Sequence, residues 1–494
     1  MKVLCIHPSR LLHARVFLRL EPLGLELVAA ALCREGHEVR LVDLQVESYR
    51  ELRAAARAFE PEVLFVSLNY LANVPEVIDL TVELRTAWPE LFVVVGGHGA
   101  SFIAEELLEH ARGAIDCVVT GEGEEIAPRL LEALRDQRRG LHRLAGVVTL
   151  DGRGPKPALV RDLDALVPAR ELARRRRRYF IGTLDPAASI EFSRGCPYDC
   201  SFCSAWTFYG RAYRKRDPLR IGEELASVRE PGIFLVDDLA FLDPEHGLAV
   251  GREIERRGIK KRYFVETRAE VLLRNREVFE YWRRLGLQCL FLGIEALEAQ
   301  GLELFRERVG VDRSLEALEV ARGLGVAVAI NVIAGPDWDE ARFRALREWA
   351  KSVPEIVHVS VATPYPGTEL FGTDPDRFIT RDYRLFDIQH AVTQTRLPLE
   401  RFYEELLRTQ QVLAHKHLGL DTLKATAGTA ARLVARGQTN FVRMLWRFNH
   451  AYDARAHLAD HRLPVRYALR LPSPLTCVAK REAPDPAPPD GPAA

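Results

Sequence analysis

Short β-rich apolar runs alternate with longer helical segments twice along this chain, and this alternation limits the fold more than any other feature. In the first 150 residues the apolar runs are rich in Val, Leu, Ile or Phe and end at polar or Gly residues. Strands are predicted at 3–7, 39–44, 63–68, 92–95 and 117–120. Helices are predicted between them at 23–34, 50–58, 74–87, 101–111 and 122–135. This order predicts a parallel, doubly wound sheet.

The second alternation begins near residue 190 and continues to about residue 370. Strands are predicted at 190–193, 232–236, 263–267, 289–293, 326–332 and 358–362. Six parallel strands wound with helices predict a partial (β/α)6 barrel, in which chemistry belongs at the carboxyl ends of the strands.

A chain of 494 residues is too long for one core, so several domains are expected. The divisions predicted are a doubly wound domain (1–150), a linker (151–188), the barrel (189–395), a helical domain (396–483) and a disordered tail (484–494). The linker contains the run Arg174–Arg178. A phosphate-bearing partner is one interpretation of this run, and a solvated or acid-paired segment is the favoured one.

Composition excludes several classes of protein. Lys plus Arg and Asp plus Glu number 69 each, so no global field attracts nucleic acid or anionic lipid. The sequence has no apolar run long enough for a membrane helix, and Met1 leads directly into a strand-like run, so a cytoplasmic protein is expected. Eight Cys are too few for a disulfide scaffold.

Three cysteines stand together at Cys196, Cys200 and Cys203, directly after the first predicted barrel strand. Thiolates favour zinc, Cu(I) or iron–sulfur clusters, and structural zinc normally needs a fourth ligand that has no candidate nearby. Three thiolates would leave one iron of a [4Fe-4S] cluster open to a substrate or cofactor. Zinc and unliganded thiols remain the alternatives.

The spacing CxxxCxxC, with Phe202 before the last Cys, resembles the radical S-adenosylmethionine (SAM) superfamily. The resemblance implies that the open iron holds SAM and that Phe202 packs beside its adenine. It also makes Asp238 and Arg268 candidates for the SAM amino and carboxylate groups, and Glu295 and Asn331 for the ribose. Taken singly, each pair of acids is better explained by a surface turn or a salt bridge, but together at one rim of the barrel they indicate a site.

A doubly wound domain before such a barrel resembles the cobalamin-binding modules of the B12-dependent branch of this superfamily. The fold class expected is therefore α/β, with a Rossmann-like cobalamin-binding domain, a partial (β/α)6 radical SAM barrel and a C-terminal helical domain. Candidate cobalamin-binding residues lie in loops after three strands: Ser67, Leu68, Asn69, Gly96, Gly97, His98, Gly121 and Glu122. The Asp-x-His-x-x-Gly motif that supplies a histidine to cobalt is missing. His98 is therefore expected to face solvent or a corrin amide rather than the metal.

The segment 189–210, the early run 19–26 and the region 447–467 resemble the hopanoid C-3 methylase family. That resemblance implies methylation of an unactivated carbon of a hopanoid lipid, with SAM used both to methylate cobalamin and as the radical source. It also implies an external electron donor. Aromatic residues after the cluster either line an apolar substrate pocket or pack at the barrel mouth: Trp206, Phe208 and Tyr209.

Two alternatives stay open. One keeps both cofactors but acts on a natural-product precursor or tetrapyrrole, by methylation or ring rearrangement. The other is a metal or redox protein with structural thiolates only. Peripheral membrane contact through the C-terminal helices, with Trp446 and Phe448, is a further expectation, although nothing in their composition demands it.

Overall fold

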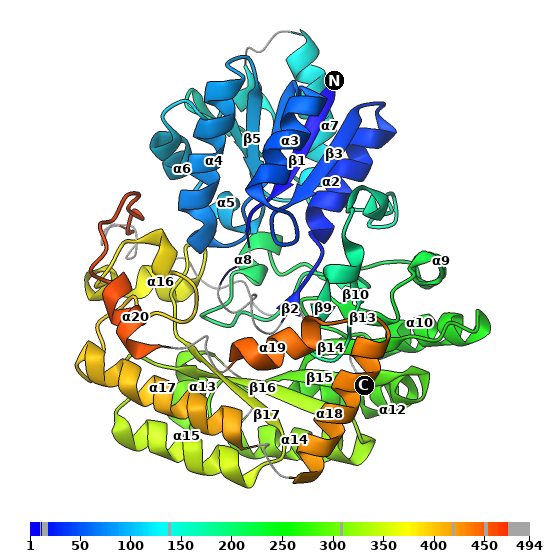
Figure 1. Ribbon diagram of the computed structural model, residues 1–494, viewed down its shortest axis with the longest axis vertical. Coiled ribbons are helices and arrows are strands. Elements are labelled where there is room, and N and C mark those ends of the chain that lie inside the picture. Colours follow the sequence, from blue (N-terminus) through cyan, green and yellow to red (C-terminus); the bar gives the residue numbers. More distant parts are fainter. Residues whose placement is uncertain are drawn as a thin grey trace, which may run out of the picture.

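A computed structural model describes residues 1–9, 11, 18–136, 140–306, 310–416, 420–448 and 453–472. Figure 1 shows two α/β bodies stacked along the long axis, with C-terminal helices beside the lower one. The expected α/β fold class is confirmed. The predicted tail, 484–494, lies outside the described residues.

The upper body is a seven-stranded sheet in the order β3-β1-β4-β5-β6-β7-β8, parallel from β3 to β6. Its strands are β1 (Lys2–His7), β3 (Glu38–Asp43), β4 (Val63–Ser67), β5 (Phe92–Gly96), β6 (Cys117–Val119), β7 (Val147–Thr149) and β8 (Gly152–Arg153). Its helices are α2 (Leu23–Arg34), α3 (Tyr49–Phe59), α4 (Val74–Ala87), α5 (His98–Phe102), α6 (Ala104–Ala111) and α7 (Gly123–Asp136). The chain reverses its winding between β1 and β4, and ligands bind at such switch points in open α/β sheets.

Helices cover both faces of this sheet, as a parallel sheet requires. One core holds β-strand residues such as Leu4 and Leu64 packed against α4 and α6, and the other holds Val3 and Cys5 packed against α2 and α7. The start of α3 is fixed by a capping box, because Ser48 accepts from Glu51 N while Glu51 accepts from Ser48 N.

The edge strands β7 and β8 were not predicted. They form an antiparallel hairpin in which Val148 pairs with Arg153 and Thr149 with Gly152. The two loop residues are Leu150 and Asp151, and Asp151 followed by Gly152 is a local turn signal that the sequence offers.

The lower body is a six-stranded parallel sheet in the order β10-β13-β14-β15-β16-β17, which is the predicted partial barrel. Its strands are β10 (Ala187–Ile190), β13 (Gly232–Leu235), β14 (Arg262–Arg268), β15 (Leu287–Gly293), β16 (Ala327–Ala334) and β17 (Ile356–Val361). The helices of this region are α8 (Ala205–Tyr209), α9 (Pro218–Ser227), α10 (Pro244–Arg256), α11 (Ala269–Arg274), α12 (Arg276–Leu285), α13 (Ala299–Leu304), α14 (Val311–Leu324), α15 (Glu340–Ser352) and α16 (Glu369–Thr373). Alternate strand residues pack against the outer helices in one large core, which leaves the other residues facing the barrel interior.

The first barrel strand differs from its prediction. A strand was expected at 190–193, but β10 ends at Ile190, and Ser193–Arg194 form a separate strand, β11, paired antiparallel with β12 (Arg214–Lys215). The Ala-rich segment 187–190 has weak strand propensity, and its pairing with β13 decides its structure.

The segment predicted as a linker makes specific contacts with both bodies. It contains β9 (Phe180–Ile181), paired antiparallel with β2 (Leu18–Arg19). Within the Arg run, Arg176 lies 2.6 Å from Glu21 and 2.9 Å from Glu230, and Arg175 pairs with Glu51. The acid-paired interpretation of these two arginines is confirmed.

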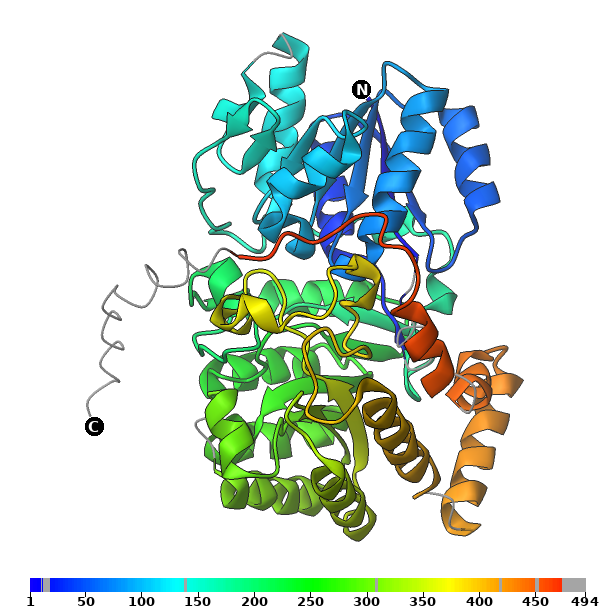
Figure 2. The same ribbon diagram turned by 90° about the vertical axis from the view of Figure 1, so that its left-hand side faces the viewer.

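The C-terminal helices are α17 (Leu399–His415), α18 (Leu420–Ala435), α19 (Asn440–Phe448) and α20 (Ala454–Asp460). After α20 the chain returns to the upper body, where Leu469 is buried in one of its two cores and Arg466 binds Asp79 of α4. Figure 2 shows this extended return in red, running along the junction of the two bodies.

Candidate functional site

The three cysteines lie on one loop between β11 and α8, at the carboxyl ends of the barrel strands. Cys200 is buried, and Cys196 and Cys203 are half-buried. The loop is braced internally, because Trp206 Nε1 donates to the Cys200 carbonyl at 3.0 Å. At its start Gly195 has φ +94°, and a Cβ there would lie 2.1 Å from the Ala212 carbonyl oxygen. Only glycine fits this turn.

The electrostatics of the loop fit a bound metal cluster. Burial raises the pKa of Cys196 and of Cys203 to about 11, so both are neutral thiols without a metal cation. Arg268 Nη1 donates to Cys200 Sγ at 3.0 Å, and a thiolate would accept this bond better than a thiol. Among the described residues no three His, Cys, Asp or Glu side chains converge on a single ion. A [4Fe-4S] cluster does not need that convergence, because each thiolate binds a different iron.

The acidic pair after β13 divides into two tasks. Asp237 accepts from Phe192 N at 2.7 Å and from Ser193 Oγ at 2.5 Å, so it fixes the turn between β10 and β11. Asp238 accepts from Gly195 N at 2.8 Å and stands beside the cysteine loop, where its charge contributes to raising the pKa of Cys203. Burial raises the pKa of Asp238 itself. Asp238 is therefore the member of the pair that reaches the loop.

The remaining predicted SAM residues lie along neighbouring strands. Arg268, Gly293, Asn331 and His358 are at one level of the sheet, since each pairs with the next. Asn331 Nδ2 donates to Ser360 Oγ at 2.9 Å, so this amide is engaged within the barrel. Glu295 follows β15, and its charge also raises the pKa of Cys203.

Phe202 packs on the side of the site formed by the ends of β15 and β16. Its ring meets Phe305 edge-on at 5.4 Å, and it joins a small core with Ala296 and Ile333 at the ends of β15 and β16. The structure thus gathers Phe202, Asp238, Arg268 and Glu295 around the cysteine loop.

Two residues that face the barrel interior were given no role in the prediction, although Glu266 was recognised as a polar residue at a strand end. Glu266 faces the barrel interior from β14, where burial, with a smaller contribution from Asp238, raises the pKa of its carboxyl to about 7. His358 faces the interior from β17, and burial lowers the pKa of its imidazole to about 4. The period of two within each strand, which sends alternate residues inward, is the signal that could have found them.

The predicted cobalamin loops interlock with one another. Asn69 Oδ1 accepts from His98 N at 3.2 Å, and Leu68 N donates to the Gly96 carbonyl at 2.7 Å. A Cβ on Gly97 would lie 2.7 Å from Asn69 Oδ1, and one on Gly99 would lie 2.8 Å from the Asn69 carbonyl oxygen. In this structure the glycines therefore let the two loops approach each other closely, rather than leaving room for a ligand at these two positions.

His98 is half-buried and contacts the cysteine loop. Its Nε2 lies 2.7 Å from Ser204 Oγ, directly after the third cysteine. Its ring packs 4.7 Å from Phe208 and 5.3 Å from Phe102, and burial lowers its pKa to about 4. His98 is a neutral contact between the upper body and the cysteine loop.

Glu122 makes a second connection of this kind. Arg194 Nη1 donates to it at 2.6 Å and Arg214 Nη1 at 2.8 Å, from strands β11 and β12 beside the cysteine loop. Burial alone would raise the pKa of Glu122, but these two arginines lower it. Its neighbour Gly121, at φ +79°, donates its backbone N–H to Ser101 Oγ at 3.0 Å. The carboxylate of Glu122 is thus engaged between the bodies.

Tyr70, at the switch point, ends the loop whose preceding residues 67–69 were predicted to bind cobalamin, but no role of its own was predicted for it. It follows Ser67, whose hydroxyl lies 3.3 Å from His7 Nδ1 across β1 and β4. Tyr70 is 53 % exposed, yet burial raises the pKa of its hydroxyl, and Glu266 of the barrel raises it further. Tyr70 of the upper body therefore lies near Glu266 of the barrel. An aromatic residue at the end of the predicted strand 63–68 is the signal for it.

The aromatic residues of α8 are engaged in packing. Besides the bond from Trp206 to the loop, Arg211 lies over the Trp206 ring at 5.2 Å. Phe208 packs on His98, and Tyr209 lies 4.8 Å from Phe208 and 5.5 Å from the Arg214 guanidinium. These contacts favour packing at the barrel mouth over lining a substrate pocket.

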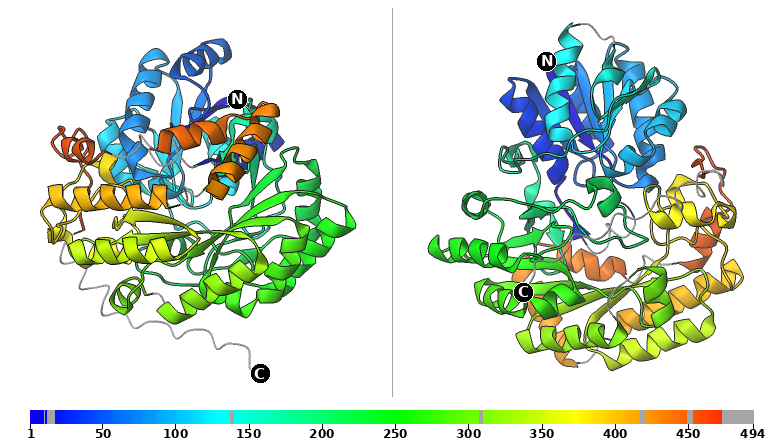
Figure 3. Two further views of the ribbon diagram at one scale, coloured as in Figure 1. Left: turned by 60° about the horizontal axis from the view of Figure 1, so that its bottom comes forward. Right: turned by 180° about the vertical axis from the view of Figure 1, so that it is seen from behind.

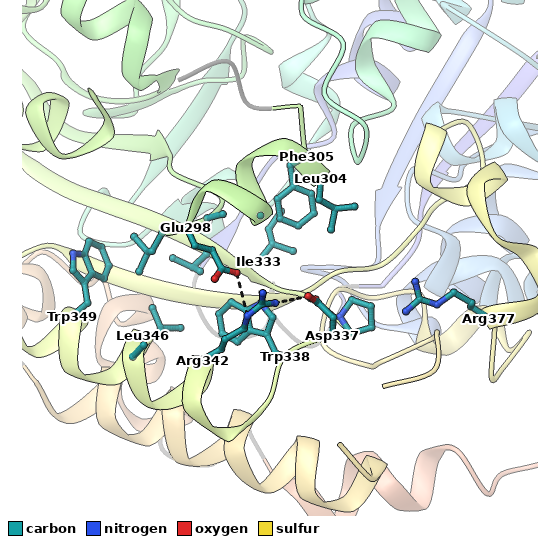
Figure 4. A pocket seen from close by; sticks show the side chains of 17 residues that line it. Glu298, Leu304, Phe305, Ile333, Asp337, Trp338, Arg342, Leu346, Trp349 and Arg377 are labelled. Atoms are coloured by element: carbon teal, nitrogen blue, oxygen red, sulfur yellow. Dashed lines mark hydrogen bonds and ion pairs between the residues drawn. The ribbon is translucent and has the colours of Figure 1, made fainter. Parts of the chain in front are cut away.

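A cavity of about 500 Å³ lies behind the site, between α13 and α15 at the ends of β15 and β16. Figure 4 shows Arg342 between two acids, with Glu298 Oε1 at 3.4 Å and Asp337 as its second partner. Its walls include Phe305, which separates the cavity from Phe202. None of the predicted substrate-pocket residues lines it.

Two family models match the chain. The B12 binding domain matches residues 9–131, and the Radical SAM superfamily matches residues 190–350. The two matches coincide with the upper body and the barrel.

The hopanoid C-3 methylase of Methylococcus capsulatus (strain Bath) is 56% identical over 476 residues, covering 96% of this chain and 92% of the relative. The chain belongs to the hopanoid C-3 methylase family. It is a cobalamin-dependent radical SAM methyltransferase, and its cofactors are cobalamin, SAM and a [4Fe-4S] cluster. The alternative of a protein with purely structural thiolates is thereby excluded.

Two more distant proteins are also similar to this chain. The anaerobic magnesium-protoporphyrin IX monomethyl ester cyclase of Cereibacter sphaeroides is 27% identical over 414 residues, covering 78% of this methyltransferase and 66% of the cyclase. The fold of the cobalamin-dependent SAM radical enzyme OxsB, solved with aqua-cobalamin and SAM bound, matches with a TM-score of 0.65 at 14% identity, covering 97% and 83% of the two chains. Within the described ranges, no helix has both the length and the apolarity needed to cross a bilayer.

Proposed function

We propose that this methyltransferase adds a methyl group to an unactivated carbon of a hopanoid, at C-3 of the A ring. The observation that carries the proposal is 56% identity along 96% of the chain to a hopanoid C-3 methylase. When bound, the cofactors supply the hydrogen abstraction and the methyl group, and the protein positions them and excludes water.

In this proposal Cys196, Cys200 and Cys203 hold the cluster, and Phe202 lies beside the SAM adenine. Asp238 and Arg268 take the SAM amino and carboxylate groups. Support comes from their position around one loop, where Asp238 binds Gly195 N and Arg268 binds Cys200 Sγ.

The ribose is assigned to Glu295 and Asn331, which follow or lie in adjacent strands β15 and β16. Asn331 would first exchange its bond to Ser360 for one to the ribose. His98 and Glu122 keep the cobalamin loops at a fixed position over the cysteine loop, and we assign them to positioning rather than to cobalt.

The domain boundaries proposed are 1–150, 151–188, 189–395, 396–483 and 484–494. An external reductant supplies the electron that radical SAM chemistry consumes. Peripheral contact with a membrane belongs to the same proposal, because a hopanoid is a membrane lipid.

A tetrapyrrole substrate is the second candidate, because the cyclase relative matches 78% of this chain. A tetrapyrrole carries carboxylates, so its pocket needs cationic or hydrogen-bonding groups.

The test is anaerobic reconstitution with iron, sulfide and cobalamin, followed by assay with SAM, a reductant and diploptene. Formation of 5′-deoxyadenosine together with a hopanoid heavier by one methyl group is expected. Deoxyadenosine without a methylated hopanoid would favour the tetrapyrrole candidate. Cys200→Ala should lose both products, whereas Cys33→Ala, at an exposed cysteine, should keep both.

A further inference from the structure

The hairpin of α18 and α19, residues 420–448, has a charge unlike that of the whole chain. The chain balances 69 basic against 69 acidic residues, yet no Asp or Glu occurs from Thr422 to Tyr452. Basic residues in that stretch are Lys424, Arg432, Arg436, Arg443 and Arg447. A local excess of cations in a neutral protein indicates a surface for an anionic partner.

One side of this hairpin is anchored to the body of the protein. Leu433 and Phe441 are buried, and Asn440 Nδ2 donates to Asp185 Oδ1 at 2.9 Å. Arg177 Nη2 also donates to the Arg436 carbonyl at 3.1 Å. These contacts hold the hairpin on the segment that precedes β10, so its inner side is already occupied.

Four large apolar side chains of the hairpin are exposed. Trp446 is 66 % exposed, Val434 49 %, and Val442 and Leu445 38 % each. Positions 442, 445 and 446 have the spacing of one helix face. Figure 2 and the left panel of Figure 3 show the hairpin in orange at the edge of the molecule. These side chains leave apolar surface exposed beside the cations of the hairpin.

The cations beside this face are available. Lys424, Arg432, Arg436 and Arg443 are exposed, and no ion pair holds any of these four among the residues described. Elsewhere the arginines are heavily paired, as Arg347 is with Glu405 at 2.7 Å. An approaching anion therefore meets these groups without displacing an acid.

We propose that the α18–α19 hairpin binds the surface of a bilayer that contains anionic phospholipid. Trp and aliphatic side chains enter the interface, while Lys and Arg meet the head groups, and this combination is typical of peripheral membrane helices. Nucleic acid offers phosphates but no apolar phase for Val442 and Leu445. The proposal rests on charge and exposure, and it holds whichever substrate the enzyme methylates.

The test is flotation of the full chain with lipid vesicles. We expect binding to phosphatidylcholine vesicles containing about one third phosphatidylglycerol, weaker binding to phosphatidylcholine alone, and release at high salt. The pairs Arg432→Glu with Arg443→Glu, and Val442→Ser with Leu445→Ser, should each lower the bound fraction about tenfold. Matched controls at exposed sites elsewhere, Arg252→Glu with Arg344→Glu and Leu150→Ser with Val167→Ser, should bind like the natural chain.

A second measurement needs no destabilising substitution. Brominated phospholipid should quench part of the tryptophan fluorescence of the natural chain, and Trp446→Phe should remove that part. The proposal is overturned if the natural chain does not float with anionic vesicles, if both hairpin pairs float unchanged, or if the chain binds RNA but not vesicles.

Discussion

Arg268 joins three parts of the candidate site through one guanidinium. It donates to Cys200 Sγ at 3.0 Å, lies 4.4 Å from the centre of the Tyr198 ring, and lies 3.9 Å from Glu270 Oε1. The aromatic ring and the acid hold the side chain in place, so its positive charge stays beside the sulfur. A cation at that position stabilises a reduced cluster, which carries one more negative charge.

Replacing Arg268 by Gln should therefore lower the midpoint potential of the reconstituted cluster. A charge-assisted hydrogen bond of about 1.5–3 kcal/mol corresponds to a shift of roughly 60–130 mV for one electron. The measurement is a redox titration followed by electron paramagnetic resonance without SAM, which separates this effect from SAM binding. Arg274→Gln, at an exposed neighbour, should leave the potential unchanged. An unchanged potential in Arg268→Gln would mean that the bond to sulfur is absent once the cluster is bound.

Gly367 marks a close contact between the two bodies. It has φ +88°, and a Cβ would lie 2.3 Å from two ring carbons of Phe102 in α5. Gly367→Ala should lower the free energy of unfolding by about 2–4 kcal/mol, because backbone strain adds to the clash. Urea unfolding checks this, with Gly24→Ala as the control. Gly24 has nothing within 4 Å of its Cβ position and lies in a helix, so that variant should be at least as stable as the natural chain.

At the scale of elements, periodicity predicts the helices well and the shortest strands poorly. The predicted bounds of 23–34 and 74–87 match α2 and α4, because an amphipathic run carries its own signal over several turns. β10 differs, because its Ala-Ala-Ser-Ile sequence becomes a strand only through pairing with β13. The same limit applies to the site. The Cys loop has a local motif, but the bond between His98 and Ser204 joins residues 106 positions apart.

Helix α2 carries a buried acid that makes stability depend on pH. Glu26 is fully buried, and neither carboxylate oxygen has a hydrogen-bond partner among the described residues. Burial, with Glu21 nearby, raises the pKa of Glu26 well above its usual range, although Arg170 and Arg176 oppose the rise. The folded chain therefore keeps a proton that the unfolded chain releases above about pH 4.3.

Stability from this group should be full below about pH 4.3 and should fall as the pH rises toward the raised value, by up to about 1.4 kcal/mol per pH unit. Glu26→Gln removes the charge and should remove this loss, so the variant should be more stable at neutral pH. Urea midpoints at acidic and neutral pH measure the slope. Glu38→Gln, at an exposed acid on β3, should keep the slope of the natural chain. If Glu26→Gln keeps it as well, Glu26 is ionised in the folded protein.

At the scale of the whole molecule, contacts distant in sequence hold the upper body over the barrel. Arg194 and Arg214 reach Glu122, His98 reaches Ser204, and Phe102 packs at Gly367. They lie close to the cysteine loop, so they hold the upper body in a fixed position over that loop. The CxxxCxxC motif and the cobalamin loops do not predict these contacts, because each of them lies within one body.

The segment after α20, the C-terminal return, also attaches to the upper body, on the side that carries α4 and α6. Leu469 is 1 % exposed in the core formed by α4, α6 and the segment around Tyr383, whose hydroxyl donates to Glu106 at 2.6 Å. Leu469→Ala removes buried methyl groups and should lower the free energy of unfolding by about 2–5 kcal/mol. It should also speed cleavage of residues 461–472 in limited proteolysis, because the return then leaves the upper body more often. Leu463→Ala, at a side chain 45 % exposed in the same segment, should change neither quantity. Equal behaviour of the two variants would mean that the C-terminal return is not held by this core, and that the arginine pairs Arg466–Asp79 and Arg470–Glu109 hold it instead.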